Sequence, residues 1–410
     1  MFNTLKLKNI SKTIGSGITP LRSNPLFWEN GTVFWLKTEQ LGEYQIYETS
    51  EKISQNAIDQ TSIKIFPKNT LSIAMYGEGR TRGNVSILKS EMTTNQACCN
   101  IVIDDKKADY EYVYYFLKTQ YQNLRSLSSG VRKNLNSNDI KEFEIRMPNE
   151  LIEQQKIAKV LSDLDVKIEL NNKINIELEA MAKMLYDYWF VQFDFPDTSG
   201  KPYKTSGGKM VWNKVLKREI PDGWQVDEIK SIANFTTGKL DSNAEVINGK
   251  YPFYTCASEP SKTDTFAFDD TVILIAGNNA SGNFHINRFK GKFNAYQRTY
   301  ITTAKNINEL EYLYQVLKTE TKLLKAQGKG SQTKFLTIGM LTGIKIFKTN
   351  SGILNIFNNL TKPMFEEQVN IRNQNEKLAS LRDWLLPILM NGQVTVEEIK
   401  EKKNNIEKKI

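Results

Sequence analysis

The sequence predicts an α+β protein built from two similar mixed α/β domains, separated by two long antiparallel coiled-coil helices. The stretch EYVYYFLKT at Glu111 recurs as EYLYQVLKT at Glu311, an offset of 200 residues with six of nine letters shared. A glycine-containing polar loop and a short strand follow each copy in the same order. Two further long segments carry apolar residues at helical spacing. The chain is therefore predicted to have a pseudo-twofold internal repeat.

Two globular domains are predicted, at residues 1–150 and 224–349. Both contain short alternating runs such as TVFWLKT and YPFYTCA, and turns rich in Gly, Asn and Pro. Such runs are typical of short strands joined by tight loops. Each domain also holds one copy of the repeated EY motif, whose apolar pattern indicates a helix. Residues 195–223, rich in glycine and polar letters, are interpreted as a surface linker between the halves.

The central segment, residues 151–194, is predicted to form one long helix. It has no Gly or Pro from Glu153 to Phe190, so it could reach roughly 55 Å as a continuous helix. Its apolar seam follows a 4-3 spacing, which is typical of a helix that wraps a partner helix. The seam consists of Ile157, Leu161, Leu164, Ile168, Asn171, Asn175, Leu178, Ala182, Leu185 and Trp189. The two asparagines either lie buried and fix the register or are simply exposed, and both readings stay open.

The second helix is predicted within residues 350–392, with a charged tail at 393–410. Pro363 and Pro387 are expected to interrupt it, because proline removes a backbone hydrogen bond. Its main body is expected between Met364 and Leu386. The two helices can bury their seams most simply against each other, and an antiparallel pairing places the attached domains at opposite ends. The pair would then act as a spacer of fixed length between the two domains.

Candidate DNA contacts lie in the polar loops of both halves. The chain has 55 Lys and Arg against 46 Asp and Glu, so its net charge of +9 favours a polyanionic partner. Glycines let a backbone approach a phosphate, while arginine and amide side chains can reach base edges. The candidates are Arg80, Arg82, Asn84, Arg132, Lys133, Asn134, Asn278, Asn279, Asn283, Arg288, Lys290, Lys329, Gln332 and Lys334.

A cluster of aromatic residues at the end of the central helix is the candidate docking surface for a partner protein. These residues are Tyr186, Tyr188, Trp189, Phe190 and Phe193, with Trp384 and Leu385 as the counterpart on the second helix. They exceed what one narrow seam can bury, which favours a partner surface. The alternative is that they belong to the core of their own domain.

No catalytic or cofactor motif stands out in the sequence. The glycines of GEGRTRG do not follow G-x-G-x-x-G, and no G-x-x-x-x-G-K-[ST] is present. The lone His285 and three cysteines without C-x-x-C spacing predict no metal site and no cofactor. Without an apolar run near 20 residues or a signal sequence, the protein is expected in the cytoplasm.

Two alternative functions remain open at this point. Asp222, Glu228 and Lys230 could imitate the metal-binding acidic cluster of a single-chain restriction endonuclease. A proline followed by Asp-Gly is more simply a turn that leads into a strand. The other alternative is a scaffold that binds DNA through its basic loops without reading the sequence.

The chain resembles the specificity (S) subunit of type I restriction-modification systems over nearly its whole length. The likeness is strongest in IEQQKIAKVLSDLDVKIELNNKINIELEAMAKMLYDYWFVQFDFP, in GKPYKTSGGKMVWNKVLKREIPDGW and in NEKLASLRDWLLPILMNGQV. The resemblance implies a non-catalytic subunit with two target recognition domains that read the two halves of a split double-stranded DNA site. It also implies two methyltransferase subunits as partners, and a motor-nuclease subunit in the full restriction complex.

Overall fold

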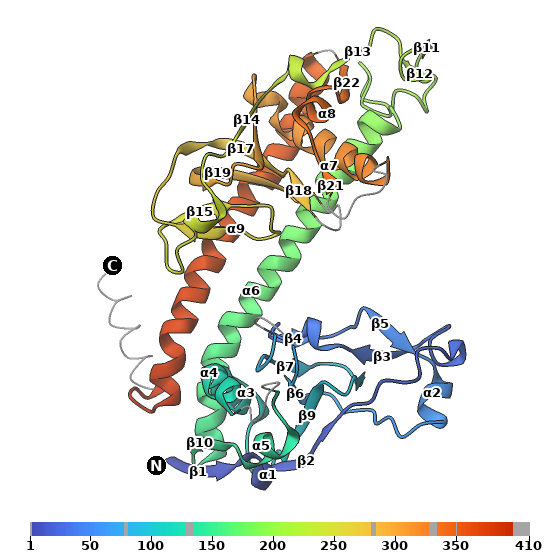
Figure 1. The fold of residues 1–410 in the computed structure, drawn as a ribbon. Coiled ribbons are helices and arrows are strands. Elements are labelled where there is room, and N and C mark those ends of the chain that lie inside the picture. Colours follow the sequence, from blue (N-terminus) through green and yellow to red (C-terminus); the bar gives the residue numbers. More distant parts are fainter. Residues whose placement is uncertain are drawn as a thin grey trace. The chain divides into compact units, whose positions relative to one another are not determined.

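A computed structural model describes residues 2–77, 81–127, 134–279, 284–327, 334–349 and 351–396. The chain divides into two compact units. Unit 1 comprises residues 1–170 and 375–410, and unit 2 comprises residues 171–374. The helices α6 (Leu151–Tyr186) and α9 (Ser351–Met390) each contribute residues to both units. Figure 1 shows the course of the chain.

Unit 1 contains three sheets. A five-stranded sheet has the order β2-β9-β6-β7-β4, a three-stranded sheet has the order β5-β3-β8, and β1 pairs with β10. The strands are β1 (Phe2–Lys6), β2 (Ser11–Ser16), β3 (Val33–Leu36), β4 (Gln45–Ile46), β5 (Glu51–Ile53), β6 (Leu71–Ala74), β7 (Val85–Leu88), β8 (Thr93–Thr94), β9 (Cys98–Ile103) and β10 (Glu144–Pro148).

The helices of unit 1 close its main core. They are α1 (Leu7–Ile10), α2 (Gln55–Asp59), α3 (Tyr110–Thr119), α4 (Tyr121–Ser126) and α5 (Ser137–Glu142), with short 3-10 turns η1 (Pro25–Phe27) and η2 (Thr38–Gln40). Asp109 caps α3 by accepting a 2.8 Å hydrogen bond from the backbone N–H of Tyr112, which satisfies a free donor of the first turn. The apolar face of α3 packs on the sheet in one cluster with Ile157 and Leu161 of α6 and Leu389 of α9. The core of unit 1 thus includes residues of both long helices.

Unit 2 is built around a six-stranded sheet of order β14-β20-β17-β19-β15-β16, and three two-stranded pairs accompany it: β11-β12, β13-β22 and β18-β21. Its strands are β11 (Met210–Asn213), β12 (Arg218–Pro221), β13 (Gln225–Glu228), β14 (Ala233–Thr237), β15 (Tyr251–Tyr254), β16 (Ser261–Thr263), β17 (Phe268–Ala276), β18 (Asn278–Asn279), β19 (Ile286–Ala295), β20 (Thr299–Ala304), β21 (Lys334–Phe335) and β22 (Lys345–Lys348). Its helices besides α6 and α9 are α7 (Leu310–Gln327) and α8 (Ile338–Thr342), with 3-10 turns η4 (Ile229–Ser231), η5 (Ser242–Ala244) and η6 (Ile307–Glu309).

The two units share one topology. The order β2-β9-β6-β7 of unit 1 matches β14-β20-β17-β19 of unit 2, and in each unit the next strand, β4 or β15, pairs in parallel with β7 or β19. The pair β1-β10 corresponds to β13-β22, and α3 and α7 carry the two copies of the EY motif. The internal repeat and the α+β fold class are confirmed.

The predicted seam of α6 is confirmed by burial. None of its ten positions is exposed, and Asn171 is 1% exposed, so the reading of this asparagine as a solvent residue is wrong. The α-helix ends at Tyr186 and continues as one π-helical turn, η3 (Asp187–Val191).

The prediction that prolines interrupt the second helix is wrong, because α9 runs unbroken from Ser351 to Met390. Pro363 and Pro387 both lie on its exposed side. There the carbonyl groups that lose a donor can bond to water, while the opposite face stays packed through buried residues such as Phe357 and Phe365.

Within unit 2, α6 and α9 run antiparallel. Trp189, in the turn η3 that follows α6, packs on Phe357 near the start of α9, with ring centroids 5.8 Å apart. Glu179, earlier on α6, meets Gln368, later on α9, where Nε2 donates to Oε2 at 3.3 Å. Residue numbers that rise on one helix therefore fall on the other.

Residues 195–223, interpreted from the sequence as a linker, fold as part of unit 2. The hairpin β11-β12 pairs Met210 with Pro221, and Phe195 and Ile220 are buried in the main core of the unit. The Asp194 carboxylate accepts hydrogen bonds from the backbone and hydroxyl of Thr205, which fixes the start of the segment. Among the described helices, none has the length and apolarity needed to cross a membrane.

Candidate nucleic-acid interface

In unit 1 the structure brings two of the predicted polar loops together at the end of β6. One loop follows β6 and contains Arg82, and the other leads from α4 to α5 and contains Asn134. The backbone N–H of Leu135 donates to the carbonyl of Met75 at 3.1 Å, and Nη1 of Arg125 donates to the carbonyl of Arg82 at 3.0 Å. Segments about 60 residues apart in the sequence thus form one edge of the unit.

In unit 2 the corresponding loops meet in the same way. The backbone N–H of Leu336 donates to the carbonyl of Gly277 at 2.9 Å, next to the short pair of β18 and β21. This pair aligns Asn278 with Phe335 and Asn279 with Lys334. Figure 1 shows β18 beside β21. The Leu135–Met75 and Leu336–Gly277 contacts are therefore equivalent, one in each half of the repeat.

A third segment joins this edge in both units. The backbone N–H of Met75 donates to the carbonyl of Ala97 at 2.8 Å, and that of Gly277 donates to the carbonyl of Arg298 at 2.9 Å. These turns precede β9 and β20 and expose Gln96 and Gln297 at matching places. Sequence analysis missed both glutamines. In each half a glutamine stands just before a strand, and aligning the two halves of the repeat could have revealed this.

The loops that follow β2 in unit 1 and β14 in unit 2 each require a glycine at one position. A Cβ on Gly17 would lie 2.0 Å from the carbonyl oxygen of Thr94, and a Cβ on Gly238 would lie 2.1 Å from that of Ala295. Both distances are impossible for a real side chain, and the obstruction is backbone. The loops TIGSGITP and TTGKLDS are thereby held against the sheet in the same way.

Nine predicted DNA contacts remain, and they fall into four groups, of which Arg288 is the last. Arg80, Arg132, Lys133, Asn283, Lys329 and Gln332 lie outside the described residues. Lys290 is exposed on β19, where its side chain is open to solvent. The amide of Asn84 donates to the carbonyl of Leu41 at 3.2 Å, so it joins the start of β7 to the segment before β4.

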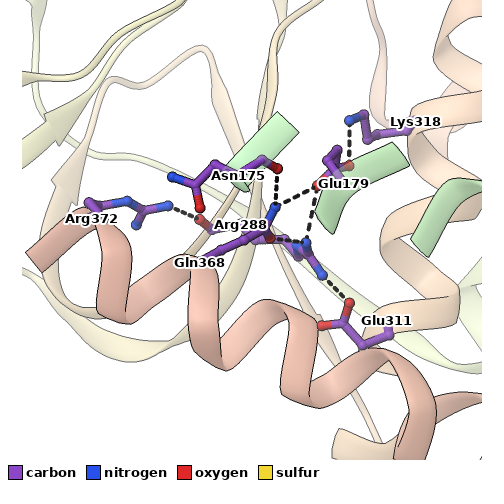
Figure 2. Close-up of polar contacts among 7 residues, drawn as sticks. All are labelled: Asn175, Glu179, Arg288, Glu311, Lys318, Gln368 and Arg372. Carbon is purple, nitrogen blue, oxygen red and sulfur yellow. Dashed lines mark hydrogen bonds and ion pairs between the residues drawn. The ribbon is translucent and has the colours of Figure 1, made fainter. Parts of the chain in front are cut away.

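The prediction that Arg288 contacts DNA is contradicted by the structure. Its side chain is 4% exposed. Figure 2 shows the guanidinium group among the side chains of Glu179, Glu311 and Gln368. The guanidinium group forms ion pairs with Glu311 and Glu179 and donates to Oε1 of Gln368 at 2.7 Å. The sequence could not reveal this, because it does not say which face of β19 packs against the helices.

Comparison with known proteins assigns the family. The family described as type I restriction modification DNA specificity domain matches residues 2–180 and 221–347. This chain belongs to that family. It is a DNA specificity subunit with two specificity domains, and its two matched regions are those that repeat in sequence and topology.

Individual relatives agree with this assignment. This chain is 30% identical over 420 aligned residues to the type I restriction enzyme MjaIX specificity subunit of Methanocaldococcus jannaschii. The alignment covers 96% of this chain and 94% of that protein. The EcoDI specificity subunit of Escherichia coli is 33% identical over 183 residues, 44% of this chain and 40% of that protein. The fold is similar to the crystal structure of a type I S subunit from M. genitalium, with a TM-score of 0.57, 19% identity and coverage of 95% of this chain and 96% of that one.

The aromatic cluster of the specificity subunit is mostly interior. Tyr186, Trp189, Phe190 and Phe193 lie in the main core of unit 2, and Leu385 lies in the core of unit 1. Phe190 contacts Tyr312 and Phe357, with ring centroids 4.7 and 5.1 Å apart. These positions agree with the alternative prediction, in which the aromatic residues belong to the core of their own domain. Only Tyr188 and Trp384, 37% and 63% exposed, stand at the surface.

An apolar groove runs beside Tyr188 on the helix pair of unit 2. It has a volume of about 710 Å³ and is lined by α6 and α9 residues that include Met181, Met184, Leu360 and Met364. In unit 1 the residues at an offset of 200 from the two α6 methionines are Leu381 and Trp384, which are also exposed. The specificity subunit thus carries a related apolar surface in each half.

The acidic residues considered for a nuclease site do not form one. Asp222 pairs with Lys209 at 3.0 Å, and the Glu228 carboxylate pairs with Lys230 and Lys345. Hydrogen bonds from those two lysines lower the pKa of Glu228 to about 2. Within the described ranges, no group of three or more Asp, Glu, His or Cys side chains could hold a metal ion.

Proposed function

We propose that this subunit reads a two-part DNA target, one part with each unit, and supplies the sequence choice of a methyltransferase that has none of its own. The observation that carries the proposal is the repeated loop edge. Leu135 bonds to Met75 in unit 1, and Leu336 bonds to Gly277 in unit 2. Two equivalent edges favour two equivalent reading sites.

The side chains at these edges suit double-stranded DNA. The side chains of Gln96 and Gln297 are exposed, and their amides can pair with the N6 and N7 edge of adenine. Arg298, next to Gln297, is also exposed. The overall charge of +9 favours association with phosphates before any base is read. Specificity then comes from a small number of side chains at each edge.

The partners proposed for the subunit are two methyltransferase subunits, one on each apolar helix surface. Exposed methionine, leucine and tryptophan side chains beside polar ones are typical of protein interfaces. The surface with Met181 and Met184 and the surface with Leu381 and Trp384 occupy equivalent positions in the repeat. A motor-nuclease subunit would join in the full restriction complex. The subunit itself supplies no catalytic group in this scheme.

The helices α6 and α9 are proposed to fix the number of unspecified base pairs between the two parts of the target. Half-sites on one face of the duplex recur about every 34–36 Å, so a rigid helical spacer can select one gap. Seven residues added to both helices at matching places should widen the gap. An unchanged gap after such an insertion would refute the spacer role.

The test is the methylation pattern of the assembled complex. The subunit is expressed with its methyltransferase, and methylated bases are mapped by sequencing the host genome. A split motif with one fixed gap is expected. Exchange of residues 1–148 for the matching domain of a relative should change only one part of the motif, whereas changes in both parts, or methylation without a motif, would contradict the proposal.

A further inference from the structure

Arg288 occupies a position that neither DNA binding nor simple core packing explains. It lies on β19, the strand of the second specificity domain that also exposes Lys290, yet its guanidinium group points into the space between α6, α7 and α9 (Figure 2). The planar group contacts two rings, with its central carbon 4.0 Å from the centroid of Tyr314 on α7 and 4.5 Å from that of Phe365 on α9. It therefore touches the domain helix and a long helix at once.

The polar contacts of Arg288 reach three helices. Nη1 pairs with Glu311 on α7, and Nη2 lies 3.2 Å from Oε2 of Glu179 on α6. The same Nη2 donates to Oε1 of Gln368 on α9 at 2.7 Å. One side chain thus joins the sheet of the domain to its own helix and to both long helices.

The surrounding residues complete the network. Nζ of Lys318 on α7 donates to Oε1 of Glu179 at 2.6 Å, and Nε2 of Gln368 donates to the backbone carbonyl of Asn175 on α6 at 3.2 Å. Arg372 on α9 donates to the carbonyl of Arg288 itself at 3.4 Å. Hydrogen bonds are directional, so a small shift of the strand relative to the helices would weaken several of these contacts at once. The network therefore favours one arrangement of the strand and the helices.

Physical chemistry favours a positioning role for such a network. Replacing a buried ion pair by apolar side chains is often neutral or stabilising, so stability alone does not require one here. Fully bonded buried polar groups instead disfavour alternative packings, because a shift leaves charges without partners. Unit 1 has its own network built from other residues, in which Asp165 of α6 bonds both Tyr115 of α3 and Arg382 of α9. Each unit thus ties its EY-motif helix to both long helices.

We propose that Arg288 is a positioning residue that holds the second specificity domain at one fixed orientation on the helix pair of its unit, and so makes the complex select a single gap length. This inference rests on the proposed function. The bases read in each half are set by the loop edges and do not depend on Arg288. The gap tolerance depends on it, because a domain that rocks on its helices can reach half-sites displaced by one base pair.

The experiment compares variants of the whole subunit in complex with its methyltransferase. DNA substrates carry both half-sites with the native gap or with a gap one base pair shorter or longer. In Arg288→Met, the preference for the native gap should fall by about tenfold or more, as expected from losing charge-assisted hydrogen bonds. The bases required in both halves should stay the same. Lys362→Met, which removes only the exposed Lys362–Glu366 pair on α9, should keep the native preference.

Gln368→Leu provides a second variant if Arg288→Met does not assemble, because it removes the three hydrogen bonds of Gln368 with Arg288, Glu179 and the carbonyl of Asn175 and leaves the ion pairs of Arg288 in place. It should also widen gap tolerance, by a smaller factor. Lower thermal stability with unchanged gap preference in an assembled variant would assign Arg288 a purely structural role and overturn the inference. Failure of the proposed function would look different, since the wild-type complex would then show no two-part motif at all.

Discussion

Asp165 of α6 and Arg382 of α9 form an ion pair inside unit 1, with Oδ1 and Nη1 2.5 Å apart and side chains 4% and 16% exposed. The hydroxyl of Tyr115 on α3 donates to the other carboxylate oxygen at 2.8 Å. The pair therefore fastens both long helices to the first domain. The Asp165 carboxylate is buried, and the Arg382 guanidinium also pairs with the exposed Asp383 at 2.8 Å.

Removing one member of this pair should be costly. Asp165→Ala removes the buried carboxylate partner of the Arg382 guanidinium and leaves it only the exposed Asp383, so the free energy of unfolding should fall by about 3 kcal/mol. Urea denaturation measures this change. The double variant Asp165→Leu with Arg382→Leu should recover most of the loss, and a single variant within about 0.5 kcal/mol of wild type would show that the pair is not coupled.

Glu311 gives unit 2 a predicted pH dependence. Burial raises its pKa from 4.5 to about 7, and the neighbouring Arg288 charge offsets only part of that effect. The folded state therefore holds this proton over a pH range in which the unfolded state has released it. The free energy of unfolding should fall by roughly 2–3 kcal/mol as pH rises from about 4.5 to 7, and level off above that. Glu311→Gln should remove this slope, measured by urea denaturation across the range; an identical slope in the variant would rule out Glu311 as its source.

The aromatic core of unit 2 can be separated from its surface by a matched pair of variants. Phe190, 1% exposed and packed against Tyr312, Phe357 and Trp224, should cost about 3–5 kcal/mol when changed to alanine. Tyr188, two residues earlier and exposed, should cost less than about 0.5 kcal/mol. Thermal or chemical unfolding distinguishes the two. Equal losses would mean that Tyr188 is also part of the core.

The apolar helix surfaces should each hold one partner. Met184→Ser in unit 2 and Trp384→Ser in unit 1 change exposed side chains, so folding should be unaffected. Each variant should lower the number of bound methyltransferase subunits from two to one, and the combination should abolish assembly. Light scattering of purified complexes reports the mass. Full assembly of the combined variant would place the docking surfaces elsewhere.

The two exposed glutamines should act on separate halves of the DNA target. Gln297→Ala should relax one base position in the half read by unit 2, with a loss of about 1–3 kcal/mol in discrimination. Gln96→Ala should do the same in the other half. Methylation of substrate libraries measures both effects. Equal weakening on all sequences would mean that these side chains touch phosphates instead of bases.

Sequence reasoning captured features that depend on local periodicity. The seam of α6 followed from the spacing of Ile157, Leu161 and their successors, and the repeat followed from the two EY motifs. Features set by tertiary packing were beyond it. Pro363 is tolerated because it lies on the exposed side of α9, and Arg288 is internal because its strand face meets three helices. Neither position can be predicted from the residues that are neighbours in the sequence.

The domain borders carry a consequence for how new specificities arise. Phe2 pairs with Pro148 across β1 and β10, and Gln225 pairs with Lys348 across β13 and β22. Each domain therefore leaves the scaffold and returns to it through adjacent antiparallel strands. Genetic recombination between related genes at these borders would exchange a whole recognition cassette while preserving both junctions. A lineage could in this way acquire a new target sequence in a single event, without changes in the rest of the complex.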